Sequence, residues 1–432
     1  MLSAIGLGAS LLLLIVLTLR GTHLLVAAPI AALLAALCSG IPIITAPADM
    51  GLVSQYMSGF TGFISSWFFM FLLGAIFGQV MADGGGASAV ARWISERLGP
   101  AHAATAVVLA CAILTYGGVS LFVVAFAVYP LAVGLFRNAN LPRRFIPGVM
   151  AFGSVTFTMT SAGSPEIQNW IPIEFLGTTP YAAWPVSLVA ALFMFGLGML
   201  WLRWMMKRAE ANGEVFESRE GDPDHDNRSL PHVMSGVIPL VLVLGVTWWL
   251  HDDYKQNALI AALAAGIIGA VVTQFKHFQH WERTLGLGAA GALVAIGNTA
   301  AVVGFGAVAK ATPAFQDAVV IMTSLPGPPL IGAALAVSVI AGLTGSASGG
   351  QAIALPLIAP HYIDQGVDPA SLHRVVAISS GALDSLPHNG YVVTTIRAIC
   401  HETHSAAYGA MGALTVIVPL IGLALALALL SF

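Results

Sequence analysis

Long uncharged apolar segments are the feature that most constrains the fold of this 432-residue chain. Ten or more of them follow one another, and about 20 apolar residues suffice to cross the hydrocarbon core of a bilayer. Hydrophobic residues make up 57% of the sequence and charged residues only 9%, against roughly 25% charged in ordinary globular domains. We therefore expect an all-α polytopic membrane protein. The same composition excludes a soluble enzyme, a nucleic-acid-binding protein and a disordered protein.

The apolar segments form two groups separated by one polar segment. They cover roughly 2–19, 24–45, 57–82, 101–136, 145–163 and 181–202, and then 234–250, 257–275, 284–309, 318–363, 375–396 and 406–431. The polar segment between the groups, 203–233, holds the main cluster of charge. We expect residues 1–202 and 234–432 to be two halves joined by this linker. The first apolar segment has no basic residue before it and no clear cleavage site, so we expect a retained helix.

The two halves contain similar residues in the same order. The matching pairs are Gly117 and Gly345, Pro130 and Pro356, Arg144 and Arg374, and Gly153 and Gly381. Their offsets lie between 226 and 230 residues, as for the last pair, where 381 − 153 = 228. Four pairs at a nearly constant offset favour an internal duplication, with Arg144 and Arg374 each preceding a helix.

The distribution of basic residues predicts the topology. Arginine and lysine cluster at Arg20, Arg92, Arg97, Arg137, Arg143, Arg144, Arg203, Lys207 and Arg208. Placing all of them in the cytoplasm requires an even number of crossings between 97 and 137. The stretch 101–136 could form two thin spans or a re-entrant hairpin with its tip at Tyr116-Gly117-Gly118, and the lack of a charged loop at this tip favours the hairpin. Continuing the count predicts ten spans, two hairpins, a cytoplasmic linker and both termini outside.

This count makes the second half face the opposite way from the first. The stretch 318–363, with Gly345 to Gly350 in its middle, then becomes a second hairpin entering from outside. Inverted repeats with broken helices at matching positions are typical of secondary transporters, which bind substrate near the midplane between the repeats. Two mixed segments, 85–99 and 310–325, are predicted to be short helices on the membrane surface or ordinary interfacial loops.

Four polar interruptions of the apolar segments are the candidate substrate site. Two are the hairpin tips at 115–120 and 344–351, and two are breaks inside helices at 158–169 and 379–390. Breaking a helix frees backbone N–H groups, and the positive end of the resuming helix favours an anion. Four such ends would form a carboxylate site without a fixed arginine; the alternative is that the small residues only permit close helix packing. The candidate substrate-binding residues are Thr115, Gly117, Ser120, Thr160, Ser161, Ser164, Gln168, Asn169, Ser346, Ser348, Gly349, Ser385, His388 and Asn389.

Three titratable residues in the broken helices are candidates for coupling-ion binding. Asp384 and His388 lie four residues apart around Pro387, and Glu166 follows the Ser164-Pro165 break. A charged side chain at the centre of a membrane helix costs about 2.5–3.5 kcal/mol on insertion scales, so a functional role is the default. The alternative for Asp384 and His388 is a structural hydrogen bond between them. For Asp83, a helix-capping role is favoured over a site.

The other polar side chains indicate no metal, cofactor or catalytic site. Cys38, Cys111 and Cys400 lack metal-ligand spacing and are interpreted as small core residues. The pairs His277/His280 and His401/His404 lie beside charged loop residues, which favours a surface location. Lys310 and Arg397 lie near helix ends and are interpreted as topology-setting residues. The formal net charge of −3 gives no basic field for nucleic acid.

Two segments of the second half resemble a known family. The sequence GSASGGQAIAL (Gly345–Leu355), followed by LHRVVAISSGALDSLPHNG (Leu372–Gly390), is similar to the signature region of the gluconate permease (GntP) family of proton-coupled symporters. The segments DGGGA (Asp83–Ala87) and SPEIQNWIPIEFLGTTPYAAW (Ser164–Trp184) resemble a branch associated with other small carboxylates. The resemblance implies a homodimer whose transport domains move against scaffold helices, here 1–82 and 234–309, by an elevator mechanism. The hairpins and broken helices, 101–180 and 318–396, would form the moving part.

One departure from the family pattern bears on the substrate. Gluconate-type members have a His- and Pro-rich sequence where this chain has TSAGSPEIQN. A short hydroxy acid such as a hydroxybutyrate therefore fits at least as well as a sugar acid. The expected function is proton-coupled symport of a small organic carboxylate across the bacterial inner membrane, with sodium coupling as the alternative. A channel is disfavoured by the occluding hairpins, and an intramembrane enzyme by the lack of a nucleophile–base motif.

Overall fold

The computed structural model describes residues 2–45, 50–219, 222, 229–278, 280–323 and 327–431, and all of its regular structure is helical. Ahead of the linker lie α1 (Leu2–Leu19), α2 (Leu24–Ser39), α3 (Leu52–Asp83), α4 (Gly86–Leu98), α5 (Ala103–Tyr116), α6 (Leu121–Asn138), α7 (Ile146–Ala151), α8 (Ile171–Leu176) and α9 (Trp184–Ala211). No strand occurs within these ranges, and the predicted all-α class is confirmed.

The second half presents the same kinds of element in the same order. They are α10 (Val233–Tyr254), α11 (Gln256–Gln274), α12 (Trp281–Lys310), α13 (Pro313–Thr323), α14 (Pro329–Thr344), α15 (Ala347–Asp364), α16 (Pro369–Ser380), α17 (Gly390–Val393), α18 (His404–Gly412) and α19 (Val418–Ser431). Each half thus has two helices, a long helix, a short helix, a helical hairpin, an interrupted helix and a final helix. Gly118 and Gly345, with φ of 94° and 61°, make the left-handed turns of the two hairpins.

Seven of the described helices are long and apolar enough to cross a membrane. They are α3, α6, α9, α10, α11, α12 and the helix that contains α18 and α19. The apolar helices α1, α2, α5 and α14 are shorter. The chain is therefore a multi-pass membrane protein, while the expectation of ten spans plus two hairpins stays a prediction.

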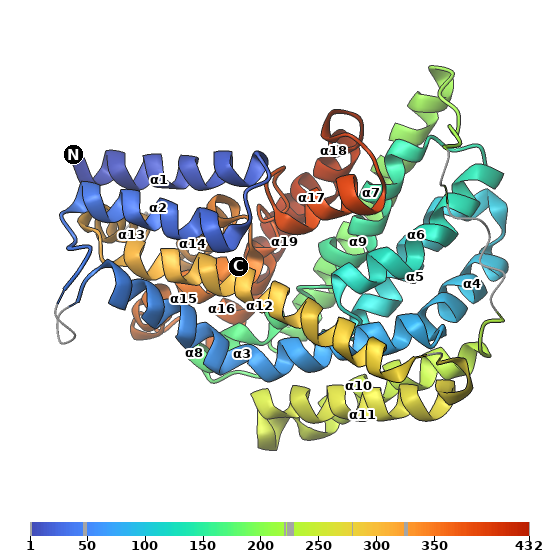
Figure 1. The fold of residues 1–432 in the computed structure, drawn as a ribbon. Helices are drawn as coiled ribbons and strands as arrows, with labels where there is room; N and C mark the ends of the chain where they lie inside the picture. Colours follow the sequence, from blue (N-terminus) through green and yellow to red (C-terminus); the bar gives the residue numbers. More distant parts are fainter. Residues whose placement is uncertain are drawn as a thin grey trace.

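Two long helices, α3 and α12, run side by side through the middle of the molecule (Figure 1). They approach closely because glycines face the partner: a Cβ on Gly59 would lie 2.8 Å from the Val303 carbonyl oxygen, and one on Gly304 would lie 2.9 Å from the Tyr56 carbonyl oxygen. The Tyr56 hydroxyl also donates to the carbonyl of Ala301 at 3.1 Å. Close backbone contact of this kind replaces hydrophobic burial as the source of helix association in lipid.

Several segment boundaries differ from the sequence-based expectation. Residues 318–323 belong to α13, so the second hairpin consists of α14 and α15, and residues 324–326 lie outside the described ranges. Within its predicted tip, only Gly345 and Ser346 form the turn, because the Ser346 hydroxyl caps α15 by accepting from the Gly349 N–H at 3.1 Å. Short helices are present in both predicted segments, as α4 and α13, and their place at the membrane surface stays a prediction.

The predicted position of Arg374 in the repeat comparison is wrong. Arg144 does precede a helix, in a short 3₁₀ turn before α7. Arg374, in contrast, lies inside α16 and is fully buried. The error arose because a basic residue in an apolar sequence resembles a helix-flanking anchor. In α16 its guanidinium instead satisfies backbone groups of the other half.

The described part of the linker folds back onto the loops before α7 and α18. Helix α9 continues to Ala211, so it includes the first residues of the predicted linker. Asp222 pairs with Arg143 at 2.5 Å and with Arg137 at 3.1 Å. Burial alone would raise the pKa of Asp222, but hydrogen bonds from the Arg219 backbone and from Arg143 hold it below its ordinary value. Residues 220, 221 and 223–228 lie outside the described ranges.

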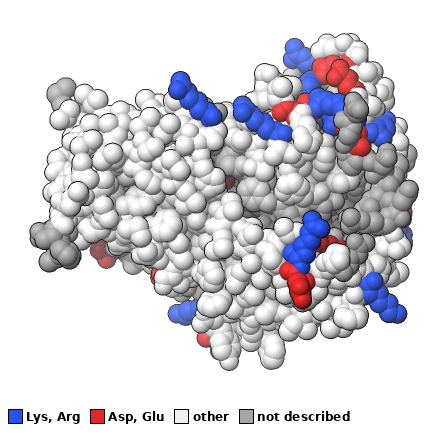
Figure 2. Space-filling model, in the orientation of Figure 1, with Lys and Arg blue, Asp and Glu red and all other residues white. Residues whose placement is uncertain are grey.

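The charged side chains gather at the end of the molecule that holds this network. Figure 2 shows Lys, Arg, Asp and Glu concentrated near α18 and the end of α9, whereas the surface over α1 and α2 has almost none. Glu402 adds contacts to Arg143 at 3.2 Å and to Arg219 at 2.9 Å. These ion pairs therefore connect the linker to the start of the first interrupted helix and to the end of the second.

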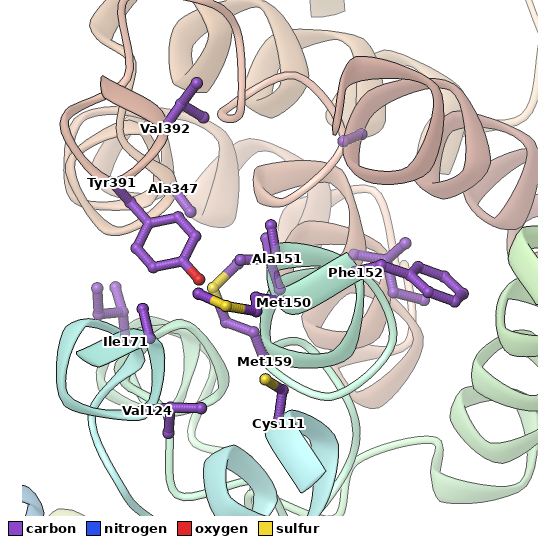
Figure 3. Close-up of a cluster of buried hydrophobic side chains, with 14 of the residues drawn as sticks. Cys111, Val124, Met150, Ala151, Phe152, Met159, Ile171, Ala347, Tyr391 and Val392 are labelled. Carbon is purple, nitrogen blue, oxygen red and sulfur yellow. The ribbon is translucent and has the colours of Figure 1, made fainter. Parts of the chain in front are cut away.

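The hairpins and interrupted helices meet in one apolar cluster. Figure 3 shows Cys111 of α5 and Val124 of α6 beside Met150, Met159 and Ile171 of the first interrupted helix, with Tyr391 of α17 pointing into the group. All of these side chains are buried. Phe122 of α6 also packs edge-on against Tyr391, with ring centroids 5.5 Å apart. This cluster holds the polar breaks of the two helices in fixed positions.

Candidate functional site

The first interrupted helix loses its regular hydrogen bonding at the predicted position. α7 continues as a π-helical segment to Thr156, and the chain then turns until α8 begins. The hairpin tip before it contacts this break directly, because the Tyr116 hydroxyl donates to the Ala162 carbonyl at 2.6 Å. Gly118 also lies beside this break, since a Cβ on Gly118 would be 3.4 Å from Cγ of Pro165.

The second interrupted helix breaks between Ser380 and Gly390, also as predicted. Asn389 fixes this break to the second hairpin tip, since its Nδ2 donates to the Gly345 carbonyl at 2.9 Å. Its Oδ1 also accepts from the Val392 N–H at 3.0 Å and so caps α17. A Cβ on Gly345 would lie 2.8 Å from Cδ2 of His388, which explains why this turn holds glycine.

The two breaks contact each other. A Cβ on Gly381 would lie 3.1 Å from Cγ2 of Thr160 and 3.4 Å from Cε of Met159. Gln351 of the second hairpin adds a bridge, because its Nε2 donates to the Gln168 carbonyl and to the Ser380 hydroxyl, each at 2.9 Å. Three of the four predicted interruptions are thereby linked, and the first hairpin tip joins them through Tyr116.

Arg374 binds the backbone of the first break and of the loop after α8. Its guanidinium donates to the carbonyl oxygens of Thr160 at 2.6 Å, Ala182 at 2.9 Å and Pro180 at 3.3 Å. Among the described residues it forms no ion pair with a carboxylate, although its side chain is fully buried. The break therefore carries a positive charge that pairs with no carboxylate of the described residues. The structure thus places an arginine beside the break, where the sequence-based expectation has none, while the carboxylate site itself stays a prediction.

Many of the candidate binding residues already have structural partners. Asn169 Nδ2 donates to the carbonyls of Ser164 and Pro180, at 3.1 and 2.9 Å. The Ser161 hydroxyl donates to the Phe157 carbonyl at 2.6 Å. Together with Ser346 and Asn389, which cap helices, these residues shape the site, and their side chains are less available to a substrate.

Other candidates have polar atoms with no partner among the described residues. The hydroxyl of Thr115, Oε1 of Gln168 and Nε2 of His388 are buried and unpaired. Ser120 and Ser348 form no side-chain hydrogen bond within the described ranges. An unpaired buried polar atom costs free energy unless water or a ligand satisfies it. Oδ1 of Asn169 is buried and unpaired in the same way, so these groups are the candidates for contact with a substrate.

The candidate coupling residues lie in different surroundings. Asp384 is buried and accepts from the Ser385 hydroxyl at 2.9 Å. No ion pair joins it to His388 in the described structure, and His388 instead faces the carbonyls of Gly342 and Leu343. Glu166 is half-buried, and its carboxylate has no hydrogen-bond or ion-pair partner within the described ranges. Neither carboxyl forms an ion pair within the described ranges, and their binding of a coupling ion stays a prediction.

The remaining sequence-based assignments concern groups outside the breaks. Asp83, at the end of α3, accepts from the side chains of Gln79 at 2.9 Å and Thr284 at 2.7 Å. Because α4 begins without a side-chain cap, these contacts join side chains and do not cap that helix. Arg397 is exposed and donates to His404 at 3.1 Å. Within the described ranges, no group of three or more His, Cys, Asp or Glu side chains is arranged to hold a metal ion.

Sequence reasoning missed the residues that hold the breaks together. Gln351, His373 and Arg374 are fully buried, and His373 contacts the Thr178 hydroxyl at 2.6 Å through Nδ1. Each is a polar residue within an otherwise apolar helical stretch, which is the signal that could have identified it. The sequence predicts Tyr116 only as part of a turn, yet its hydroxyl links the first tip to the first break.

Comparisons with known proteins agree with this architecture. The model of the GntP family permeases matches residues 1–247. An uncharacterized transporter of Bacillus subtilis, YxjC, is 36% identical over 444 residues, with 92% of each chain covered. An uncharacterized transporter of Haemophilus influenzae is 26% identical over 224 residues, 52% of each chain. These matches suggest a transporter rather than an enzyme.

Two solved transporter structures share the fold. The YdaH transporter of Alcanivorax borkumensis matches with a TM-score of 0.58 and 16% identity, covering 99% of this chain and 97% of its own. MtrF of Neisseria gonorrhoeae, described with a class of antimetabolite efflux pumps, matches with a TM-score of 0.51 and 15% identity, covering 95% and 94%. Since the family model covers the first half and the Bacillus relative both halves, the chain belongs to the GntP family of permeases.

Proposed function

We propose that this permease is a secondary active transporter that carries a small organic carboxylate together with protons across a bacterial inner membrane. The observation that carries the proposal is the buried guanidinium of Arg374. It has no carboxylate partner among the described residues, and it donates to the Thr160 carbonyl of the first break. A fixed positive charge in a low-dielectric site attracts an anion strongly. The substrate carboxylate supplies the missing negative charge.

The unpaired polar groups supply the remaining contacts in this proposal. Ser120 and Thr115 come from the first hairpin, Ser348 from the second, and Gln168 and His388 from the two breaks. Helix α6 begins at the first tip without a side-chain cap, so its positive end also faces this region. Few hydroxyl groups are available, which favours a short hydroxy acid over a polyhydroxylated sugar acid.

Asp384 is the proposed proton carrier. Protonation neutralises its buried carboxyl, so that no net charge has to be held at the break. One proton carried with a monoanion makes the cycle neutral, and additional protons make it electrogenic. Glu166, at the break of the other half, is the second candidate. Sodium coupling is the alternative, because the hydroxyl groups at the hairpin tips are also suitable sodium ligands.

The proposed mechanism is alternating access by an elevator movement. The repeated order of elements supports two repeats, and the distribution of basic residues supports their inverted arrangement, with the linker in the cytoplasm and both termini outside. In this scheme α1–α3 and α10–α12 form the scaffold of each protomer in a homodimer. The hairpins and interrupted helices move together, and their hydrogen bonds through Gln351 and Arg374 make them one rigid unit.

Uptake into proteoliposomes tests this function. Purified protein is reconstituted, and uptake of labelled short hydroxy acids, sugar acids and neutral sugars is measured under an inward proton gradient, an inward sodium gradient or neither. We expect a hydroxy acid to accumulate only under the proton gradient. Accumulation driven by the sodium gradient alone would identify sodium, not the proton, as the coupling ion. Uptake of neutral sugars in preference to acids would contradict a carboxylate site. Labelling of cysteines introduced at Arg219 or Asp222 from outside intact cells would contradict the topology.

A further inference from the structure

A cavity of about 430 Å³ opens between the start of α5, the loop after α6 and the last turns of α9, away from the candidate substrate site. Its volume lies within the range of about 300–1,000 Å³ typical of small-molecule sites. Met199 and Leu202 form an apolar wall, and both are buried. Arg203 and Lys207 line the same cavity, one helical turn apart on α9.

The two cations at this cavity are free to bind an anion. Within the described ranges neither Arg203 nor Lys207 forms an ion pair or a side-chain hydrogen bond. The positive end of α5 faces the same opening, since Ala103 and Ala104 also line it. Glu210 contributes one negative charge at the rim, so the lining stays net positive.

A second cavity nearby, of about 170 Å³, differs in this respect. Its arginines already have partners: Arg144 pairs with Glu214 at 2.6 Å, and Arg208 lies over the ring of Trp204 at 5.6 Å. The larger cavity is therefore the one whose charge has no partner in the described structure.

The position of the cations along α9 indicates what kind of anion they meet. From Trp184 to Leu202 the helix has 19 residues without a charge, and at 1.5 Å per residue these cover about 28 Å, close to the thickness of the hydrocarbon core. Arg203 and Lys207 follow directly and so lie at the level of lipid phosphates. Trp201 and Trp204 flank the first of them, as aromatic residues do at the interface.

We propose that this cavity binds the headgroup of an anionic phospholipid. Arg203 and Lys207 contact the phosphate, and the acyl chain runs along the wall formed by Met199 and Leu202. The apolar wall on the hydrocarbon side of the cations distinguishes this site from one for a free phosphate ion. The bound lipid would bridge the first hairpin and α9, which both line the cavity.

Native mass spectrometry of the delipidated full chain tests the proposal. Dioleoyl phosphatidylglycerol and dioleoyl phosphatidylcholine are titrated separately, and retained lipid is counted. We expect phosphatidylglycerol to be retained preferentially. The double variant R203Q/K207Q should lose this retention by roughly tenfold or more, because each cation near a membrane surface contributes to anionic-lipid binding. The exposed single variants R203Q and K207Q provide a check if the double variant fails to fold.

The matched control removes two exposed cations outside the cavity, in R20Q/K276Q, and should leave lipid retention unchanged. Inorganic phosphate is tested in parallel by thermal shift and should not stabilise the protein. Equal retention of the two lipids, or full retention of phosphatidylglycerol by R203Q/K207Q, would overturn the proposal. Stabilisation by inorganic phosphate that disappears in R203Q/K207Q would identify a free-anion site and would also overturn it.

Discussion

Nη1 of Arg374 donates to the carbonyl oxygen of Thr160 at 2.6 Å, so an arginine from the second half of the chain closes the helix break in the first half. Gln351 makes a parallel connection from the second hairpin to the carbonyl of Gln168. The peptide groups that a broken helix leaves unsatisfied are thus bound by side chains from the opposite half. The candidate site therefore consists of residues from both halves of the chain.

Replacing Arg374 should affect stability and anion binding together. Arg374→Met leaves the carbonyls of Thr160, Pro180 and Ala182 unsatisfied, and we expect the free energy of unfolding to fall by about 3 kcal/mol or more. Arg374→Lys keeps the charge but lacks the planar set of N–H donors of a guanidinium, so it should lose less stability than Arg374→Met. Thermal unfolding with and without carboxylate measures both effects. The exposed Arg397→Met is the control and should change stability by under about 0.5 kcal/mol. A stable Arg374→Met variant with normal anion binding would show that the arginine is dispensable.

The Gln351 bridge can be tested against a glutamine of the same helix region. Gln351→Leu removes two hydrogen bonds between buried groups, so we expect a loss of about 1–3 kcal/mol in unfolding free energy. Gln365→Leu removes an exposed contact with His361 and should have little effect. The measurement is thermal unfolding of both variants in the same detergent. Equal melting temperatures for the two variants would mean that the bridge contributes nothing.

Gly345 and Gly366 allow backbone strain to be separated from crowding at the site. Both have positive φ, 61° and 77°, but a Cβ on Gly345 would meet His388 whereas one on Gly366 would meet nothing within 4 Å. Gly345→Ala should therefore reduce transport strongly by displacing His388, while Gly366→Ala should cost only about 1 kcal/mol in stability. Uptake and melting temperature are measured for each. If the two variants transport equally well, the contact at His388 has no functional role.

The stability that the ion pairs of Asp222 contribute should decrease as the pH falls. The pKa of Asp222 is lower in the folded protein than in the unfolded chain, so its contribution is complete above the unfolded pKa of about 3.9 and is lost as the pH falls through the folded pKa. Asp222→Asn should lower stability by about 1–3 kcal/mol at pH 7, and the difference from wild type should vanish in strong acid. Melting temperatures from pH 7 to pH 3 measure this. Glu217→Gln, at an exposed position, is the control. A difference that is constant with pH would exclude the ion pairs as its cause.

The helices and the positions of their breaks could be predicted from the sequence, because both depend on local properties. Apolar length defines a membrane helix, and Gly345 or the Ser164-Pro165 pair interrupts one wherever it occurs. Helix α4 was likewise evident from its mixed composition. These features need no knowledge of the neighbouring helices.

The contacts between the breaks could not be predicted in this way. Arg374 and Thr160 are 214 residues apart, and only the folded structure brings them together. The roles of Asn169 and Asn389 could not be predicted either, since an amide that binds backbone groups and an amide that binds substrate look the same in sequence. Residue type therefore predicts where the helices break but not which side chains at the breaks remain unpaired.

The most direct test of the proposed mechanism is accumulation of substrate by Asp384→Asn. Asparagine keeps the size of the buried side chain but cannot carry a proton. In proteoliposomes we expect this variant to bind and exchange substrate across the membrane, yet to lose accumulation driven by a pH gradient. Asp368→Asn, at the exposed cap of α16, should accumulate substrate normally. If Asp384→Asn still concentrates substrate against its gradient with a normal pH dependence, Asp384 is not the proton carrier and the proposed coupling is wrong.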